Sequence, residues 1–192
     1  MARTLAFDRK VAVQGARTVF WSKGFEASSI PELEEATGLS RSSIYNSFGS
    51  KRGLFDAAVH SYLEEIVRPR LRPLLAADVE PSALGRYLDS LAVALGHPGS
   101  LPAANGCLLV NSANSPISAD EAVSAVVGAY RQEMHDALGR GLGAARPDLD
   151  AARHALLTDT VTGLVIAAFA LVRVSRTEAV RLVRCAAELV DR

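Results

Sequence analysis

The chain has 192 residues and carries 21 Lys/Arg against 21 Asp/Glu, so its formal net charge is zero. A neutral chain is not a general nucleic-acid coater, because non-specific binding of nucleic acid depends on excess cations. Its apolar content of 49% excludes wholesale disorder. The charge is unevenly placed: residues 1–55 hold eight Lys/Arg and five Asp/Glu, a net of +3, which leaves −3 for residues 56–192. Any surface for a polyanion is therefore expected in the N-terminal part.

Targeting signals are absent from the pattern of this sequence. The N-terminal MARTLAFDRK is polar and charged, unlike a signal peptide. The most apolar run, residues 160–172, is too short for a bilayer of about 30 Å. Cys107 and Cys185 form no motif and fit a reducing compartment. We expect a cytoplasmic protein with no membrane partner.

Apolar residues recur with a helical period along most of the chain, and no strand-like alternation stands out. Gly24 should end the first helix, Pro69 should break the fourth, and three glycines between residues 139 and 143 should loosen the end of the seventh. Residues 96–102 read as a loop. We therefore predict an all-α fold. The expected helices cover residues 7–23, 30–37, 41–47, 50–69, 84–95, 105–111, 119–142, 149–174 and 177–191.

Strong capping signals surround a short turn near the N-terminus. Ser29 and Glu32 have the S-x-x-E spacing of a capping box, in which each side chain bonds the other residue's amide. Gly38 suits a left-handed position after the first short helix, and Ser40 suits the N-cap of the next. Two short helices joined at Gly38 have the order of a DNA-reading helix-turn-helix.

The second short helix should bury Ile44 and Phe48 and leave a polar face outward. Arg can bridge guanine O6 and N7, and Asn can bridge adenine N7 and N6. Serine and tyrosine hydroxyls, with helix N-terminal amides, suit phosphate oxygens. Lys51 follows at a helix start, where a bound phosphate would make its charge favourable; its alternative role is an ordinary solvated cation. The candidate DNA-contacting residues are Ser28, Ser29, Ser40, Arg41, Ser42, Ser43, Tyr45, Asn46, Ser47 and Lys51.

Several short motifs between residues 8 and 60 form a specific set when taken together. They are Ala16-Arg-Thr-Val-Phe20, Lys23-Gly-Phe25, Ser28-Ser-Ile30, Gly38-Leu-Ser-Arg-Ser-Ser-Ile-Tyr-Asn-Ser-Phe48, Ser50-Lys51 and Leu54-Phe55. This region resembles the TetR family of transcriptional regulators. The resemblance implies a third helix in the major groove of DNA, with Tyr45 and Lys51 on phosphates. Ser47 stands where His or Tyr is frequent in that family and Arg52 where an acid is frequent, so the operator sequence does not follow.

The resemblance also implies two domains. We predict a helix-turn-helix DNA-binding domain over residues 1–50. Residues 51–192 would form a helical effector-binding and dimerisation domain, with the helix at 50–69 as the connector.

The expected helix at residues 149–174 is apolar nearly all round between Val161 and Val172. Such a helix must be covered on every side, and a second copy of the chain can cover the side that one domain leaves open. We therefore predict a homodimer through the two last helices, at 149–174 and 177–191. The alternative is that the first of them is the central core helix of a monomer.

A small-molecule effector is expected in the C-terminal helical domain, enclosed between apolar helices. The lack of a buried charge signature favours a neutral or weakly polar ligand. Each candidate lining residue could equally be plain core. These candidates are Tyr62, Tyr87, Cys107, Tyr130, Met134 and Phe169.

The sequence therefore predicts a DNA-binding transcriptional regulator, most simply a repressor that an effector releases from a palindromic double-stranded operator. A ligand-independent regulator and one that senses oxidants through the Cys107 thiol remain open. A small helical enzyme is a remote alternative, because no nucleophile has a nearby base in the pattern. No Cys/His cluster has metal spacing and no Gly-rich phosphate loop follows a strand, so we expect no metal, cofactor or catalytic residue.

Overall fold

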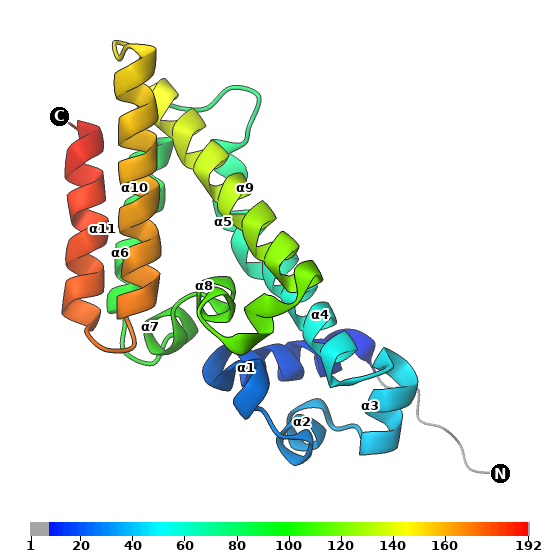
Figure 1. Cartoon of the computed structure of the whole chain (residues 1–192). Coiled ribbons are helices and arrows are strands. Elements are labelled where there is room, and N and C mark those ends of the chain that lie inside the picture. Colours follow the sequence, from blue (N-terminus) through cyan, green and yellow to red (C-terminus); the bar gives the residue numbers. More distant parts are fainter. Residues whose placement is uncertain (1–7, 192) are drawn as a thin grey trace. The chain divides into compact units, whose positions relative to one another are not determined.

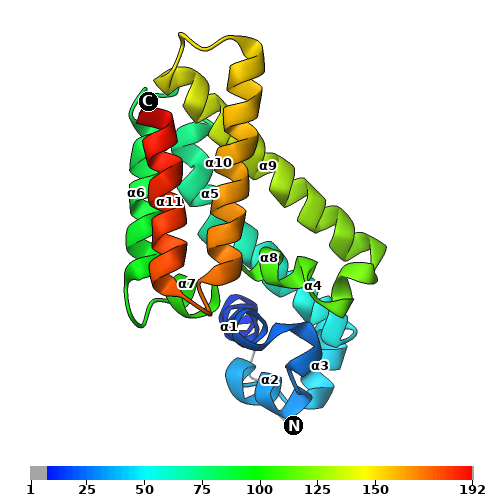
Figure 2. The ribbon, with the colours of Figure 1, turned by 60° about the vertical axis from the view of Figure 1, so that its left-hand side comes forward.

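The computed structural model describes residues 8–191, which form helices, turns and loops but no strand (Figures 1 and 2). The all-α prediction is therefore confirmed. The chain forms two compact units, Met1–Ile66 and Val67–Arg192. We describe each unit by itself.

The first unit holds four helices, and their bounds follow the local signals closely. They are α1 (Arg9–Ala27), α2 (Ile30–Thr37), α3 (Arg41–Phe48) and α4 (Lys51–Tyr62). Gly24 interrupts α1 with a φ of 81°, as its predicted role in ending the helix requires. Residue 7, where the first helix was predicted to begin, lies outside the described residues.

The predicted break at Pro69 is wrong, because the chain stays helical through it. A single π-helical turn at Leu63–Val67 follows α4, and α5 (Arg68–Leu71) and a 3-10 turn at Arg72–Leu74 continue from there. Pro69 occupies the first turn of α5, where its missing N–H costs no hydrogen bond. The change in helical geometry therefore occurs before the proline.

The second unit contains the longer helices. They are α6 (Ala83–Gly96), α7 (Leu101–Asn105), α8 (Leu108–Ala113), a 3-10 turn (Pro116–Ala119), α9 (Glu121–Ala145), α10 (Ala151–Leu171) and α11 (Arg176–Asp191). Both views place α6, α10 and α11 side by side, while α9 runs obliquely (Figures 1 and 2). The short α7 lies partly in the predicted loop, because the Ser100 hydroxyl caps the Ala103 amide at 3.1 Å.

The glycines near the end of α9 do not loosen it, which corrects the prediction. A Cβ on Gly141 would lie 2.8 Å from Leu74 Cδ2 and 3.0 Å from Leu84 Cβ. A Cβ on Gly139 would lie 3.2 Å from Thr158 Cγ2. These glycines therefore allow other segments to approach the helix closely, and packing holds α9 helical to Ala145.

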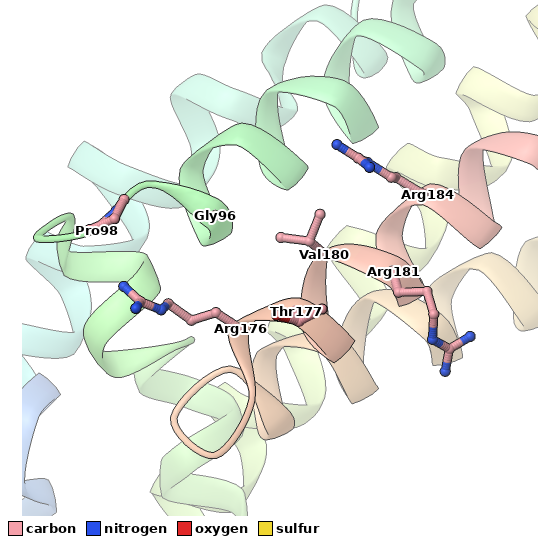
Figure 3. A pocket seen from close by; sticks show the side chains of 7 residues that line it. All are labelled: Gly96, Pro98, Arg176, Thr177, Val180, Arg181 and Arg184. Atoms are coloured by element: carbon pink, nitrogen blue, oxygen red, sulfur yellow. The ribbon is translucent and has the colours of Figure 1, made fainter.

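The second unit is built around α6, α10 and α11. Gly96 at the end of α6 lies beside α11, since a Cβ there would be 3.4 Å from Val180 Cγ2 (Figure 3). One face of α10 stays open: Leu156 is 56% exposed and Leu171 is 42% exposed. By length and composition alone α10 could span a membrane, a test that core helices of soluble proteins also pass.

The boundary between compact units falls after α4, whereas the predicted functional boundary falls before it. The Phe20 ring of α1 meets the Phe55 ring of α4 edge-on at 5.2 Å, so α4 shares the core of the first unit. A division of function at residues 50 and 51 stays a prediction.

Candidate functional site

The turn between α2 and α3 is held by the caps that the sequence predicts. The Ser29 amide donates to Glu32 Oε2 at 2.8 Å, and the Ser29 hydroxyl accepts from the Glu32 amide at 3.4 Å. Gly38 has a φ of 69°, and the Ser40 hydroxyl accepts from the Ser43 amide at 3.3 Å. Both capping pairs are local, which explains why the spacing alone located α2 and α3.

Glu32 carries a second role that the sequence does not reveal. Its carboxylate also pairs with the Lys23 ammonium of α1. This hydrogen bond, followed by those from Ser29, lowers the pKa of Glu32 to about 2. The carboxylate therefore stays ionised near neutral pH and ties the start of α2 to α1.

An exposed polar face covers α3. Arg41, Ser42 and Asn46 are exposed, and Tyr45 is 38% exposed. The Arg41 guanidinium carbon lies 5.6 Å from the centre of the Tyr45 ring, within cation–π range. The opposite side of α3 is fixed in the core by Ile44, which is fully buried. The structure therefore presents an Arg, a Tyr and an Asn together on one rigid short helix.

Glu34 positions the start of this face and was missed by the sequence reasoning. Its carboxylate accepts from the Arg41 amide at 2.5 Å, across the turn between α2 and α3. An acid exposed on a helix gives no sequence signal for such a contact, because the contact depends on how the two helices cross.

Lys51 lies half-buried at the start of α4, with its ammonium 4.6 Å from the centre of the Phe25 ring. Burial lowers the pKa of Lys51, and the nearby Glu26 and Glu32 carboxylates oppose that change. The neighbouring Arg52 forms an ion pair with Asp56 at 2.8 Å instead. Of the two adjacent cations, Lys51 is thus the one held by an aromatic ring rather than by an acid.

Nine of the ten predicted DNA-contacting residues are exposed or half-buried, but Ser28 is not. Ser28 is 2% exposed, and its hydroxyl donates to the Gly24 carbonyl oxygen at 2.5 Å. This burial argues against a direct contact of the Ser28 side chain with DNA. The serine instead closes the turn after α1.

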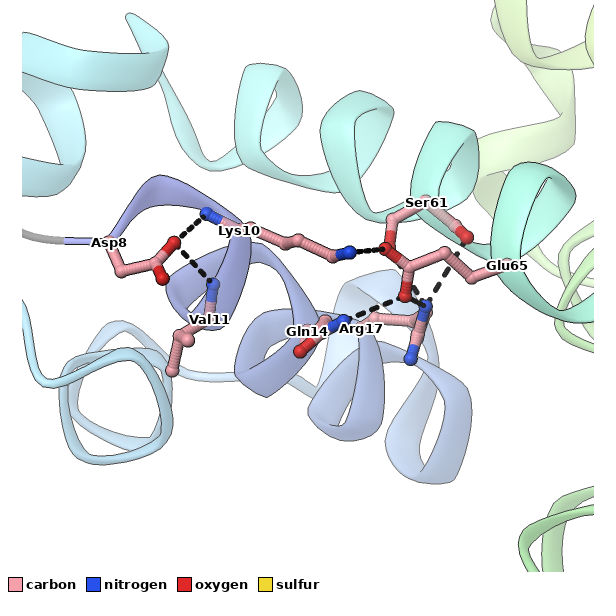
Figure 4. A network of polar contacts seen from close by, with 7 residues as sticks. All are labelled: Asp8, Lys10, Val11, Gln14, Arg17, Ser61 and Glu65. Atoms are coloured by element: carbon pink, nitrogen blue, oxygen red, sulfur yellow. Dashed lines mark hydrogen bonds and ion pairs between the residues drawn. The ribbon is translucent and has the colours of Figure 1, made fainter.

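A polar network fixes α1 to the turn that follows α4 (Figure 4). Glu65 Oε2 accepts from Gln14 Nε2 and from Arg17 Nη1, both at 2.8 Å. Arg17 Nη1 also donates to Ser61 Oγ at 2.8 Å, and Lys10 Nζ lies 3.8 Å from Glu65 Oε1. These bonds, those from Gln14 and Arg17 first, lower the pKa of Glu65. These bonds therefore hold α1 against the C-terminal end of α4, and α1 and α4 are the helices on which α2 and α3 pack.

In the second unit, three of the predicted effector-site residues touch one another. The buried Cys107 thiol donates to Tyr130 Oη at 3.4 Å, and Tyr130 Oη donates to Met134 Sδ at 3.7 Å. Gly106 has a φ of 69°, and a Cβ on it would lie 2.4 Å from the Phe169 carbonyl oxygen. The backbone before Cys107 therefore passes directly against α10 at Phe169, which is itself buried.

The two remaining candidates differ in their surroundings. Tyr87 keeps partial solvent exposure as a residue, but burial of its phenol raises its pKa to about 12. Tyr62 belongs to the first unit, where its ring meets Trp21 edge-on at 5.0 Å. The structure thus groups Cys107, Tyr130 and Met134 by direct contact, and the set of six as one site stays a prediction.

Comparisons with known proteins match this architecture. Residues 12–58 match the model of bacterial regulatory proteins of the tetR family. The chain is 33% identical over 121 residues to the HTH-type transcriptional repressor ComR of Escherichia coli strain K12, in an alignment that covers 62% of this chain and 56% of ComR. It is 30% identical over 142 residues to the HTH-type transcriptional regulator YezE of Bacillus subtilis strain 168, which covers 74% of this chain and 72% of YezE.

Solved structures agree over nearly the whole chain. A cysteine mutant of the TetR family transcriptional regulator CifR, complexed with a 26-bp double-strand operator DNA, aligns with a TM-score of 0.79 and 28% identity, covering 97% of this chain and 98% of that one. The reduced form of E. coli NemR shares the fold, with a TM-score of 0.76 and 15% identity, covering 95% and 94% of the two chains. The chain belongs to the TetR family and is a helix-turn-helix transcriptional regulator.

Proposed function

We propose that this protein represses transcription by binding a palindromic double-stranded operator as a homodimer, and that a small-molecule effector releases it. The observation that carries the proposal is the exposed polar face of α3, where Arg41, Tyr45 and Asn46 project from a helix anchored by Ile44. The similarity to CifR, whose structure contains operator DNA, supports the same partner here. Such a regulator works in the cytoplasm, where bacterial DNA lies.

The roles within the interface follow from side-chain chemistry. Arg41 and Asn46 carry groups that match guanine and adenine edges in the major groove. Tyr45, Lys51 and the hydroxyls at the two helix starts suit phosphate oxygens. The serines of that group are Ser29, Ser40, Ser42, Ser43 and Ser47.

The neighbours Lys51 and Arg52 supply a matched pair for testing these roles. Lys51→Ala should weaken binding to all DNA sequences alike and flatten the dependence of affinity on salt by about one ion. Arg52→Ala, which removes a cation already paired with Asp56, should change both quantities much less. Equal effects of the two changes on fluorescence-anisotropy titrations over a salt series would contradict the role of Lys51.

The open face of α10 supports the homodimer. One row of its exposed or half-buried positions recurs about once per helical turn and carries no charge, so it forms one continuous, largely apolar stripe. These positions are Leu156, Thr160, Gly163, Ala167 and Leu171, and Val174 extends the row in the turn after α10. The adjacent edge of α11 continues the stripe with the half-buried Leu182 and Leu189. A second copy of the same stripe would remove both from water about a two-fold axis.

The oligomeric state tests this directly. Ala167→Glu should convert the dimer to a monomer in sedimentation or light-scattering measurements, because two carboxylates would meet near the axis. Val93→Glu places the same charge at an exposed apolar site on α6, where Val93 is 70% exposed, and should leave the dimer intact. A wild-type protein that is monomeric in these measurements would contradict the proposed homodimer.

The effector proposal is supported by the character of the second unit's interior. Its buried polar side chains are uncharged: Asn105, Ser112, Thr158 and Thr162. Burying an unpaired charged ligand among such groups would be costly, so a neutral or weakly polar effector fits best. The predicted lining residues are Tyr62, Tyr87, Cys107, Tyr130, Met134 and Phe169.

The main experiment is a selection of bound fragments from the source genome, with wild type beside Tyr45→Ala at near-physiological salt. We expect an imperfect palindrome enriched by the wild type alone. Enrichment that survives Tyr45→Ala would refute the assignment of the reading face. Operator binding in the presence and absence of cell extract would then show whether an effector is required.

A second candidate input is oxidation of Cys107, because its buried thiol bonds Tyr130, which in turn bonds Met134, so that a change at this sulfur would disturb the interior. Peroxide would convert the thiol to a sulfenic acid, which no longer fits the same packing. Wild type should then lose operator affinity after peroxide treatment and recover it with reductant, while Cys107→Ser should not respond. Cys185→Ser is the matched control. A response that disappears in Cys185→Ser would assign the sensing to the other thiol.

A further inference from the structure

A basic hollow lies between the end of α6 and the first turns of α11, entirely within the second unit (Figure 3). Its volume is about 550 Å³, and its lining includes Gly96, Val180 and the guanidinium-bearing Arg176 and Arg184. A second hollow of about 390 Å³ shares Arg176 and adds Arg173. These residues belong neither to the DNA-reading face of α3 nor to the contacts among Cys107, Tyr130 and Met134.

Three arginines line the hollow, and two of them, Arg176 and Arg184, have no partner among the described residues. Arg176 and Arg184 are exposed, and within residues 8–191 neither forms a hydrogen bond or an ion pair. Arg181 differs, because its Nη2 lies 2.8 Å from Glu178 Oε2. Figure 3 shows the Arg176 and Arg184 side chains turned toward α6, with Val180 between them, while Arg181 points away. The hollow thus presents two unneutralised cations and one apolar side chain.

Capping of α6 does not account for Arg176. The Val93 carbonyl oxygen accepts from the His97 amide at 3.0 Å, and the Ala94 carbonyl oxygen accepts from the Ser100 hydroxyl at 2.7 Å. The loop after α6 therefore supplies donors to that helix end from its own residues. Arg176 stays free for another acceptor.

We propose that Arg176 and Arg184 form a binding site for a small organic dianion whose two acidic groups are joined by an apolar linker. Arg176 and Arg184 are eight positions apart on α11, which separates their Cα atoms by about 12 Å along the helix axis. A short anion is therefore expected to reach only one of the two guanidinium groups. Each guanidinium can bind one carboxylate or phosphate through paired N–H donors. Val180, half-buried between them, would contact the linker.

The site stays open in the proposed homodimer. Successive residues of a helix are rotated by about 100°, which places Arg176, Val180 and Arg184 on the α6 side of α11. Leu182 and Leu189, which continue the apolar stripe of α10, lie on another side. Occupancy of the hollow and dimerisation therefore do not compete for the same surface.

Calorimetric titration of the full-length protein at low ionic strength tests the proposal with defined probes. Suberate carries two carboxylates on an apolar chain, octanoate carries one, and succinate carries two that are close together. We expect saturable binding of suberate, about tenfold tighter than that of octanoate or succinate. Absence of saturable suberate binding, or equal affinities for the three probes, would overturn the site.

The variants separate a specific site from general charge attraction. Arg176→Gln and Arg184→Gln should each weaken suberate binding about tenfold, to the level of the monoanion. Arg181→Gln removes the same charge from the same helix but from a guanidinium that points away, so it should leave the affinity within about twofold. An equal loss in all three variants would show attraction to a basic surface without a defined site. Circular dichroism and the melting temperature confirm that each variant is folded.

Discussion

The two compact units of this protein differ in how the starts of particular helices are fixed. In the first unit, the ends of α2 and α3 are set by side chains that cap neighbouring amides, as Ser29 and Ser40 do. In the second unit, Ser100, Asp120 and Asp150 cap α7, α9 and α10 in the same way, but Ser82, which precedes α6, makes no capping hydrogen bond to an amide. The uncapped α6 is instead positioned by its packing on α11. Local capping thus fixes the starts of α2 and α3 in the DNA-reading unit, whereas long-range packing takes its place at α6 in the second unit.

The largest effect is expected where the first unit packs backbone against backbone. A Cβ on Gly15 would lie 2.0 Å from the Ala36 carbonyl oxygen, so Gly15→Ala must push α1 and α2 apart. We expect it to lower the free energy of unfolding by about 3 kcal/mol, measured by urea denaturation. Gly128→Ala is the control, because a Cβ there meets nothing within 4 Å. It should stabilise α9 by about 0.5–1 kcal/mol. Similar losses in both variants would contradict the close approach of α1 and α2.

The next effect concerns the Glu65 network, which fastens α1. Arg17 has a side chain only 12% exposed and donates to both Ser61 and Glu65. Arg17→Met should therefore cost about 1–3 kcal/mol, because it leaves the Glu65 carboxylate without the guanidinium that donates to it at 2.8 Å. Arg52→Met removes an i,i+4 pair whose Asp56 partner is exposed, and should cost about 0.5 kcal/mol or less. Thermal unfolding at two salt concentrations compares the stability losses of the two variants. Equal losses would show that the Arg17–Glu65 pair contributes no more than an ordinary surface ion pair.

The contrast between the capped start of α2 and the uncapped start of α6 gives a smaller effect. Ser29→Ala removes the hydroxyl that accepts from the Glu32 amide in the α2 capping box and should cost about 1 kcal/mol. Ser82→Ala, at the equivalent position of α6, should cost close to nothing because no amide is capped there. A larger loss of stability for Ser82→Ala than for Ser29→Ala in chemical denaturation would contradict the stronger capping of α2.

The smallest effect is a pH dependence confined to the first unit. The folded pKa of Glu32, about 2, lies below the ordinary value of 4.5. The unfolded chain therefore binds more protons between these values, and stability rises with pH across that window. The stabilisation is present above pH 4.5 and is lost as the pH falls through about 2. Glu32→Gln and Lys23→Met should each flatten the stability profile over this range. An unchanged profile in Lys23→Met would show that Lys23 is not the main cause.

Much of the fold was determined by the sequence itself. The S-x-x-E spacing at Ser29, the glycine at Gly38 and the serine at Ser40 act on atoms a few residues away, so their consequences can be derived without knowledge of the fold. The same holds for the ends of α11, which differ from the prediction by one residue at most. The polar face of α3 also followed, because the helical period alone assigns Ile44 to the core.

Only the tertiary structure decided which of these groups are available. Ser28 is buried in a turn, and Lys51 rests on the Phe25 ring. The contact of Cys107 with Tyr130 joins residues 23 positions apart, and that of Arg17 with Glu65 joins residues 48 apart. Such contacts depend on how helices cross, which is a sum of many packing energies and not a property of any local spacing.

The glycines show the same division of information. The three glycines between residues 139 and 143 predicted a frayed end for α9, because glycine destabilises a helix that has no packing partner. The structure instead places Leu74 and Leu84 against Gly141 and keeps the helix intact. The sequence determined which positions are glycines. The fold decided whether each glycine makes the chain flexible or leaves room for a neighbouring segment, because packed neighbours stabilise a helix against the conformational entropy of its glycines.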